Sequence, residues 1–208
     1  MLYFLRSIFR FCGVAALLWG LWGCGVMPPS ADVSRLPSSD QWQTVKTEAI
    51  QLDIPQAYVG GDPGLQLPEI QATLTALGFG DRTEWLAQNA TKIDLLFFRA
   101  EGRELRTINV VHTARPAELS LENYLQAQVR KLEAGGVTVE AQGIDPTTSQ
   151  GFLQVQKAEM RQTTYVYPSE EDFWVITYSG GLSDARATSE IERSRQSFQV
   201  LPKIPEQS

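Results

Sequence analysis

The stretch DFWVITYS, residues 172–179, carries large side chains on both faces of what its composition predicts to be a β-strand. Phe173, Val175 and Thr177 alternate with Trp174, Ile176 and Tyr178. Neither set is charged, so the alternation between a buried and a solvated face that marks a half-exposed strand is missing. Large uncharged side chains on both faces are typical of strands that are covered on both faces. We therefore predict that residues 172–179 form a central strand of a sheet.

Six other segments have the composition and length of strands. Each is five to eight residues long and either alternates apolar with polar residues or is continuously apolar. Gly, Pro or charged residues in turns bound these segments. They are residues 50–54, 93–98, 107–113, 137–141, 151–158 and 161–167, of which the first is stopped by Pro55. Glu101-Gly102-Arg103 is the predicted turn between the second and the third of these strands.

Helical periodicity is clearest in the stretch after Pro116. Ser120 is a candidate N-cap, Gly135-Gly136 end the pattern, and the apolar positions recur at helical spacing: Leu121, Tyr124, Leu125, Val129 and Leu132. Two short helices are predicted earlier, one opened by Pro68-Glu69 and ending at Gly78, and one opened by an Asp81–Glu84 capping box. A closing helix is predicted over residues 183–198.

The order of these elements predicts an α+β fold with a mainly antiparallel β-sheet flanked by α-helices. The chain of 208 residues is long enough for one sizeable core. We expect one domain over residues 41–202, followed by a tail over residues 203–208.

The charge balance excludes some classes of partner. The formal net charge is −6, and it becomes two units more negative if the first 23 residues, with Arg6 and Arg10, are removed. Phosphate binding needs clustered Lys and Arg, so we expect no nucleic acid partner. Attachment to an anionic membrane by charge alone is disfavoured for the same reason.

The N-terminal segment reads as a targeting signal. Arg6 and Arg10 precede an uncharged apolar stretch over residues 11–22, which has the length of a secretory h-region. Residues 21–24, LWGC, then resemble the lipobox of bacterial lipoproteins, although Trp22 stands where a small residue is usual. The resemblance implies cleavage before Cys24, a diacylglycerol thioether on its sulfur and an acyl chain such as palmitate on its amine. Residues 24–40 would then be the lipid anchor and a flexible spacer.

Two other interpretations of this segment stay open. Residues 11–27 are uncharged and could form an uncleaved signal anchor that spans the membrane as a tilted helix. Ordinary secretory cleavage is the third alternative. In each case the domain lies outside the cytoplasm. Cys12 and Cys24 are the only cysteines, so the domain itself contains no thiol, disulfide or cysteine metal cluster.

Three segments resemble the superfamily of photosystem II extrinsic P-subunit (PsbP)-like proteins, which includes bacterial envelope lipoproteins. They are LSLENY at residues 119–124, FWVITY at residues 173–178, and the closing helix with SFQV at residues 197–200. The resemblance covers about residues 45–201. It implies a PsbP-like α/β/α sandwich, and an extracytoplasmic location in a bacterial periplasm or a thylakoid lumen.

The sequence offers few candidates for chemistry. His112 is the only histidine and has no nucleophile motif beside it, so we interpret it as structural or exposed. The acidic run Glu170-Glu171-Asp172 could bind a divalent cation weakly, but we interpret it as a solvated turn. The Asn89-Ala90-Thr91 sequon is given no weight in a bacterial-type lipoprotein. We expect no catalytic residues, no metal and no cofactor.

Four aromatic residues are the candidate pocket. Tyr165 and Tyr167 share one face of a predicted strand, and Trp174 and Tyr178 share one face of its expected neighbour. Aligned, these side chains could form the floor of a pocket for an apolar or ring-shaped ligand, and core packing under a helix would explain them as well. The leading hypothesis is a non-enzymatic, membrane-anchored envelope lipoprotein that binds or helps to assemble a protein partner. The alternative is a carrier of a small apolar ligand, a lipid or a pigment, between sheet and helix.

Overall fold

The computed structural model describes residues 41–181 and 185–202. These residues form two compact units, one made of residues 60–181 and the other of residues 41–59 together with 185–202. The described helices include none that is long and apolar enough to span a membrane. Cys24, the leader, the whole spacer and the tail lie outside the described residues, so the predictions made for them stay predictions.

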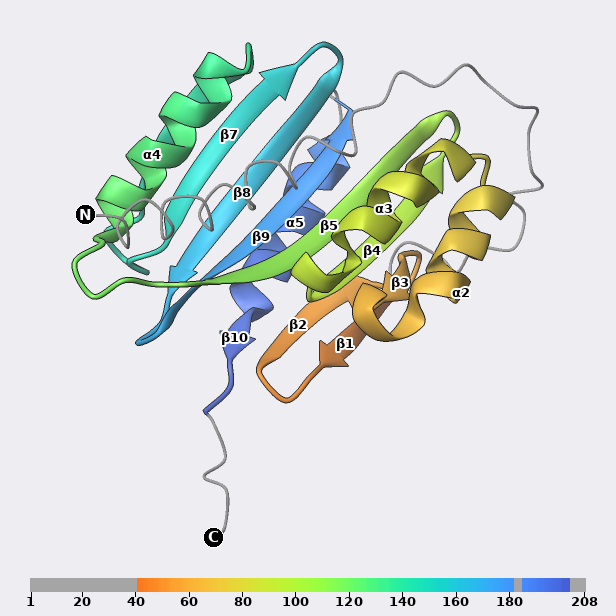
Figure 1. Cartoon of the computed structure of the whole chain (residues 1–208), viewed down its shortest axis with the longest axis horizontal. Coiled ribbons are helices and arrows are strands. Elements are labelled where there is room, and N and C mark those ends of the chain that lie inside the picture. Colours follow the sequence, from red (N-terminus) through yellow and green to blue (C-terminus); the bar gives the residue numbers. More distant parts are fainter. Residues whose placement is uncertain (1–40, 182–184, 203–208) are drawn as a thin grey trace, which may run out of the picture. The chain divides into compact units, whose positions relative to one another are not determined.

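The larger unit is built on a seven-stranded sheet (Figure 1). Its strand order is β3-β4-β5-β9-β8-β7-β6, and the pairings from β4 through to β6 are antiparallel. The strands are β3 (Val59–Gly61), β4 (Leu95–Glu101), β5 (Glu104–Ala114), β6 (Thr138–Ile144), β7 (Gly151–Lys157), β8 (Met160–Pro168) and β9 (Asp172–Gly181). Strand β9 lies in the middle of this order and is buried from Phe173 to Ser179, so the predicted central strand is confirmed.

Helix α4 (Leu121–Ala134) forms as predicted. Ser120 caps it, because its hydroxyl oxygen accepts a hydrogen bond of 3.2 Å from the backbone N–H of Asn123. Its apolar stripe packs on β6 and β7 in one cluster of side chains, made of Val129, Leu132, Val137, Val139, Leu153 and Val155. Gly151 allows this close approach, since a Cβ at that position would lie 3.0 Å from a methyl carbon of Leu125.

Helix α2 (Pro63–Ala76) begins before the predicted start at Pro68. Asp62 is its N-cap, with a carboxylate oxygen 2.7 Å from the backbone N of Gly64, and Pro63 occupies the first turn. Pro68 therefore lies inside the helix, and Gln66 has the non-helical angles φ −121° and ψ 23°. A proline in a helix interior removes one backbone hydrogen bond and crowds the preceding turn, so the helix kinks there.

The predicted capping box at Asp81 and Glu84 is wrong. The chain enters α3 (Thr83–Asn89) through the 3₁₀ turn η2 (Gly80–Arg82), and a second 3₁₀ turn, η3 (Ala90–Lys92), follows it. Arg82 holds the N-cap position without a side-chain cap. Asp81 lies within the 3₁₀ turn and forms an ion pair of 3.1 Å with Arg82, so its carboxylate is engaged before the helix starts.

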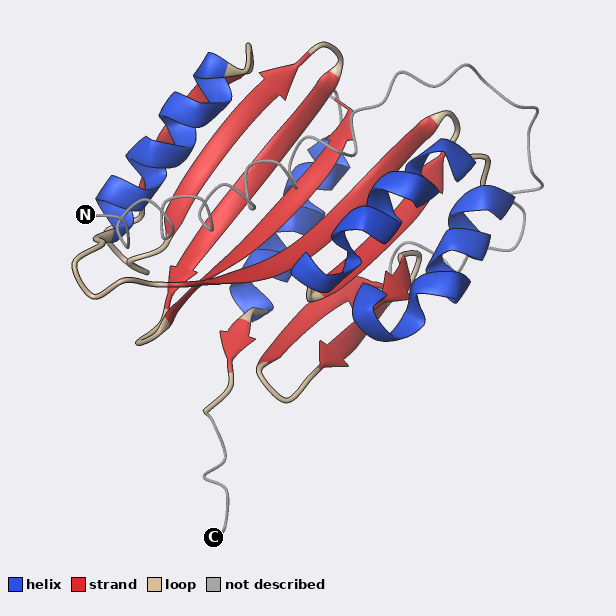
Figure 2. Cartoon of the chain, in the orientation of Figure 1, coloured by secondary structure: helices blue, strands red, loops and turns tan. Residues whose placement is uncertain are grey.

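Figure 2 shows α3 over β4 and β5, and α4 over β6 and β7, on the same side of the seven-stranded sheet. The predicted α+β class with a mainly antiparallel sheet is therefore confirmed. The strands β8 and β9 lie between these two helices in the order of the sheet.

The smaller unit contains a three-stranded sheet and one helix. Strands β1 (Trp42–Lys46) and β10 (Gln199–Val200) pair antiparallel to β2 (Ile50–Pro55), and α5 spans Ala185–Ser197. The Ser197 hydroxyl accepts a hydrogen bond of 2.8 Å from the backbone N–H of Asp53, and the Arg193 guanidinium lies 4.0 Å from the ring centre of Trp42. The predicted strand at residues 50–54 and the closing helix are confirmed, while β1, β3 and β10 were not predicted.

Candidate functional site

The four aromatic residues of the candidate pocket lie on one face of the large sheet. Tyr167 is opposite Trp174, Tyr165 is opposite Ile176, and Tyr178 is opposite Thr163, and residues opposite each other share a face. The Tyr165 and Tyr178 rings meet edge to face with their centres 6.2 Å apart. Tyr167, Trp174 and Tyr178 are buried. These residues line neither of the two cavities described below, and their role as a pocket stays a prediction.

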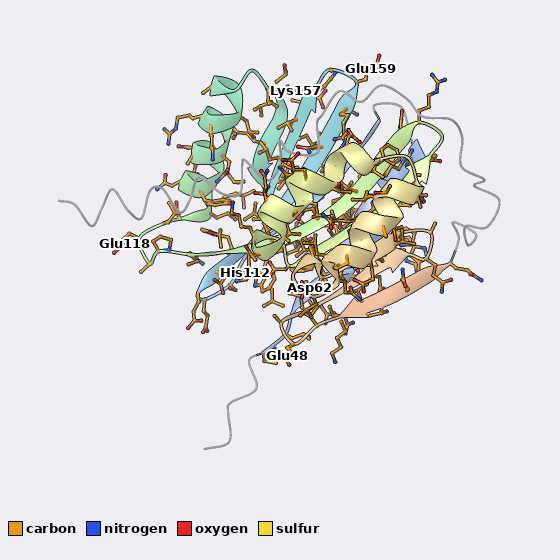
Figure 3. All side chains as sticks on the ribbon, turned by 45° about the vertical axis from the view of Figure 1, so that its right-hand side comes forward. Glu48, Asp62, His112, Glu118, Lys157 and Glu159 are labelled. Atoms are coloured by element: carbon orange, nitrogen blue, oxygen red, sulfur yellow. The ribbon has the colours of Figure 1, made fainter. Side chains whose placement is uncertain are left out.

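His112 lies on this aromatic face, at the end of the sheet opposite the turn that carries Lys157 and Glu159 (Figure 3). Its Nδ1 is 2.8 Å from both carboxylate oxygens of Asp94, and its ring centre is 5.0 Å from that of Trp174. The side chain is half exposed. The hydrogen bond to Asp94 raises the pKa of His112 above its usual value, against the opposing effect of partial burial.

A pH dependence follows for this pair. Because the folded pKa is raised, the pair stabilises the fold fully below the unfolded pKa of about 6.5, and the contribution is lost as the pH rises through the folded pKa. As the only histidine, His112 can be followed directly by its ring resonances in an NMR titration. We expect a midpoint above about 6.5 in the protein and a lower one in Asp94→Asn. Equal midpoints in the two proteins would show that Asp94 does not raise the pKa of His112.

Acidic clusters do not supply a metal site in the described part of the chain. No group of three or more His, Cys, Asp or Glu side chains among residues 41–181 and 185–202 is placed to hold a metal ion. The carboxylates of residues 170–172 therefore belong to no such group. Its turn is held instead by Ser169, whose hydroxyl is 3.1 Å from the backbone N and 3.0 Å from the backbone O of Asp172.

The opposite face of the sheet, on which α4 packs, carries a feature of different chemistry. Here called the polar block, it consists of six buried, uncharged polar side chains on the three central strands β5, β9 and β8: Thr107, Asn109, Gln162, Thr164, Thr177 and Ser179. The strand register places them in two rows. One row runs Leu153, Thr164, Thr177, Asn109, and the other runs Val155, Gln162, Ser179, Thr107. Because Leu153 and Val155 pack with α4, the block faces the same side as that helix.

The hydrogen bonds within the polar block are incomplete. Gln162 donates to the Ser179 hydroxyl at 3.0 Å, and the hydroxyls of Thr164 and Thr177 are 3.1 Å apart. On β5, by contrast, the Thr107 hydroxyl and the Asn109 side-chain oxygen are buried without a hydrogen-bond partner among the described residues. The great majority of buried side-chain polar atoms in native proteins have a partner, so each such atom calls for an explanation.

Helix α4 adds two more unpartnered atoms on its inner side. Tyr124 and Gln128 are one turn apart, and their side chains are 1% and 7% exposed. In the described part of the chain, the Tyr124 hydroxyl and the Gln128 amide oxygen have no hydrogen-bond partner. The Tyr124 ring packs on Phe173 of β9 with ring centres 4.6 Å apart, which turns this side of the helix toward the centre of the sheet. Burial raises the pKa of Tyr124, so its hydroxyl stays protonated at physiological pH.

A cavity of about 160 Å³ opens at one end of the polar block. It is lined by residues of the η2 turn, the β4–β5 hairpin, the β7–β8 turn and the end of β9: Phe79, Arg82, Arg103, Glu104, Leu105, Thr107, Glu159, Met160, Gly180 and Gly181. Thr107 belongs both to this lining and to the block. Figure 3 labels Glu159 at this end of the sheet, far from His112. The cavity therefore reaches an unpartnered buried hydroxyl.

Sequence patterns alone do not reveal the polar block. Thr164 and Thr177 fit a β-strand pattern because threonine is a favoured strand residue. The signal that could have found the block is the recurrence of Thr, Asn, Gln or Ser two positions apart on each of three strands, at residues 107 and 109, 162 and 164, and 177 and 179. Tyr124 and Gln128 are likewise hidden, because Tyr124 fits the apolar helical stripe and Gln128 reads as an ordinary polar position.

Comparison with known proteins finds distant likenesses among solved structures only. No protein-family model matches the chain, and no curated protein matches it. A crystal structure of LpqN, described as involved in cell envelope biogenesis of Mycobacterium tuberculosis, is similar at 12% sequence identity and a TM-score of 0.44. The likeness covers 78% of this chain and 91% of that chain. Membership of the PsbP-like superfamily stays a prediction.

Proposed function

We propose that this protein is a non-enzymatic binding protein, tethered outside the cytoplasm by lipid on Cys24, whose folded part holds a small ligand at the polar block of the large sheet. The observation that carries the ligand site is a pair of buried polar atoms on β5 that have no hydrogen-bond partner among the described residues, the Thr107 hydroxyl and the Asn109 side-chain oxygen. A thylakoid location and a photosystem role are not part of the proposal, because no observation favours them.

Buried polar atoms without hydrogen-bond partners destabilise a fold. A buried donor or acceptor without a partner costs about 1–3 kcal/mol, whereas an apolar side chain of the same shape would cost nothing of this kind. Thr107 and Asn109 could be replaced by Val and Leu without a change of strand pattern, since both positions are buried on β5. Polar groups kept at such positions are explained if a bound molecule supplies their hydrogen bonds.

Native mass spectrometry of the protein purified from its own membrane tests this proposal. We expect a non-covalent mass in addition to the covalent lipid, released by collisional activation. The double variant Thr107→Val/Asn109→Leu should lose it. The matched control is Thr163→Val, which changes a buried threonine on the opposite face of β8, and it should keep the mass. A protein that carries no such mass, or a double variant that retains it, would contradict the proposal.

A second candidate function is the binding of a protein partner, favoured by the edge of the large sheet. Strand β6 is the last strand in the order and alternates exposed and half-buried residues. Beside it lies a cavity of about 340 Å³ lined by residues of α4 and β6, including Ile144, which is 40% exposed. An open strand edge beside an apolar side chain can pair with an extended segment of another protein. The same native spectrum separates the two candidates, because a bound protein adds a mass of several kilodaltons or more.

A further inference from the structure

We propose that the cavity beside Thr107 binds a small zwitterion, an α-amino acid with an apolar side chain of modest size. This inference rests on the proposed function, a small ligand held at the polar block, and names the chemical class of that ligand. It departs from the sequence-based alternative, a carrier of an apolar lipid or pigment, because the cavity is lined by charged as well as apolar side chains.

The Thr107 side chain points to the side of the sheet on which the cavity lies. Leu105 is two residues before Thr107 on β5, so the two side chains share a face. Thr107 is opposite Ser179 on β9, and Gly181, two residues later on β9, is opposite Met160 of β8. Leu105, Gly181 and Met160 line the cavity together with Thr107. The cavity therefore ends at a threonine that is 3% exposed and whose hydroxyl has no hydrogen-bond partner among the described residues.

The charged side chains of the lining are mostly unpaired. Arg103, Glu104 and Glu159 form no ion pair with any residue among 41–181 and 185–202. The remaining charged residue, Arg82, forms an ion pair of 3.1 Å with Asp81. Arg103 and Glu104 belong to the β4–β5 hairpin, and Glu159 belongs to the β7–β8 turn (Figure 3). The cavity thus presents one unpaired guanidinium and two unpaired carboxylates.

The Glu104 carboxylate has a defined place in this lining. A Cβ at Gly181 would lie 2.8 Å from the carboxyl carbon of Glu104, so the carboxylate rests against bare glycine backbone. Both residues line the cavity, which places this carboxylate at the cavity wall.

A ligand with two opposite charges matches these groups better than a ligand with one. A simple anion beside Arg103 would also lie near two carboxylates, and a simple cation beside the carboxylates would lie near a guanidinium, and like charges placed together are unfavourable. A guanidinium can donate two parallel hydrogen bonds to a ligand carboxylate. An ammonium group has three donors, enough for the carboxylates of Glu104 and Glu159. An α-amino acid carries both charged groups on one carbon.

The volume and the apolar part of the lining limit the side chain of this ligand. The cavity has a volume of about 160 Å³. An engineered cavity of about 150 Å³ binds benzene, so there is room here for about six to nine non-hydrogen atoms. Phe79, Leu105 and Met160 are half-buried and supply an apolar wall. The Thr107 hydroxyl can donate to a carboxylate or accept from an ammonium group. A small apolar amino acid such as valine meets these conditions.

Isothermal titration calorimetry of the full mature protein, dialysed in a nonionic detergent, tests the inference. The probes are L-valine, N-acetyl-L-valine, which has no ammonium group, and L-valinamide, which has no carboxylate. We expect saturable binding of L-valine. Each derivative should bind at least about tenfold more weakly, because it lacks one of the two groups that form charge-assisted hydrogen bonds.

Arg103→Gln and Glu104→Gln localise the binding. Each should bind L-valine at least about tenfold more weakly and keep its melting temperature, because both side chains are exposed. The matched controls, Arg130→Gln and Glu133→Gln, remove the same charges from exposed positions of α4 outside the lining and should bind L-valine as the original protein does. Thr107→Val removes the buried hydroxyl and should weaken binding by about threefold to tenfold.

Three results would overturn the inference. If N-acetyl-L-valine or L-valinamide binds as tightly as L-valine, one of the two charges is not recognised and a zwitterion is the wrong class. If L-valine does not bind, the inference fails, while the proposed function is judged separately by the mass that co-purifies with the protein. If Arg103→Gln and Glu104→Gln bind L-valine as tightly as the original protein, this cavity is not its site.

Discussion

Replacing Trp174 with Ala is expected to lower the free energy of unfolding by about 3–5 kcal/mol, the range for large aromatic side chains removed from a core. Trp174 is only 6% exposed on the central strand β9. Its ring lies 5.0 Å from the His112 ring, and in the strand register it is opposite Tyr167, so its loss leaves a cavity bordered by two partly or fully buried rings. Urea denaturation of the purified protein measures the difference.

The same variant separates the two interpretations of the aromatic face. Tyr165→Ala is the matched control, since Tyr165 lies on the same face but is only half-buried, and its removal should cost clearly less than that of Trp174. A core residue affects stability whether or not a ligand is present. If Trp174→Ala left the free energy of unfolding within about 0.5 kcal/mol of its original value, as a surface substitution does, packing would be the wrong interpretation and the predicted pocket would gain support.

The parts of the fold that the sequence predicts are those in which local chemistry and packing agree. Residues 172–179 are apolar on both faces, and β9 is accordingly the middle strand of seven. Ser120 and Gly135 bound α4 because a hydroxyl cap and a glycine stop act within one turn of the chain. These signals need no knowledge of distant residues.

The errors in the predicted fold come from interactions that the pattern does not contain. Pro68 reads as the first residue of a helix, yet α2 already begins at Pro63 and passes Pro68 with a kink. Strand β10 has two residues and exists because β2 lies beside it, so its own sequence is too short to indicate it. Asp81 has the spacing of a cap but is used in an ion pair with Arg82.

In the candidate site, too, groupings that depend on local pattern could be predicted, and groupings that depend on distant residues could not. The grouping of Tyr165, Tyr167, Trp174 and Tyr178 on one face follows from alternation within two neighbouring strands, and the register agrees with it. The polar block needs three strands in a defined register, since Asn109 and Thr164 are neighbours only through Thr177. Whether a polar side chain is paired depends on atoms tens of residues away, which is why the unpartnered oxygens of Asn109 and Gln128 could not be predicted.

Cys24→Ser is expected to abolish acyl labelling of the protein and to release it from the membrane. The lipobox resemblance places a thioether-linked diacylglycerol on the Cys24 sulfur, and a serine hydroxyl cannot form that thioether. A single acyl chain anchors a protein only weakly, whereas two or more hold it stably, and each buried CH₂ contributes about 0.8 kcal/mol. Metabolic labelling with a palmitate analogue and fractionation measure both effects.

Cys12→Ser is the matched control, because Cys12 is the only other thiol and lies in the segment that the signal peptidase would discard. It should leave labelling and membrane attachment unchanged. The mass of the mature N-terminus decides between the alternatives: a chain that starts at a lipidated Cys24 supports the lipoprotein, and one that keeps Met1 in the membrane fraction identifies an uncleaved signal anchor. Because Trp22 stands where lipoproteins usually have a small residue, slow processing of the original chain should become faster in Trp22→Ala if the signal peptidase cuts before Cys24. An unchanged processing rate together with unchanged labelling in Cys24→Ser would refute the site.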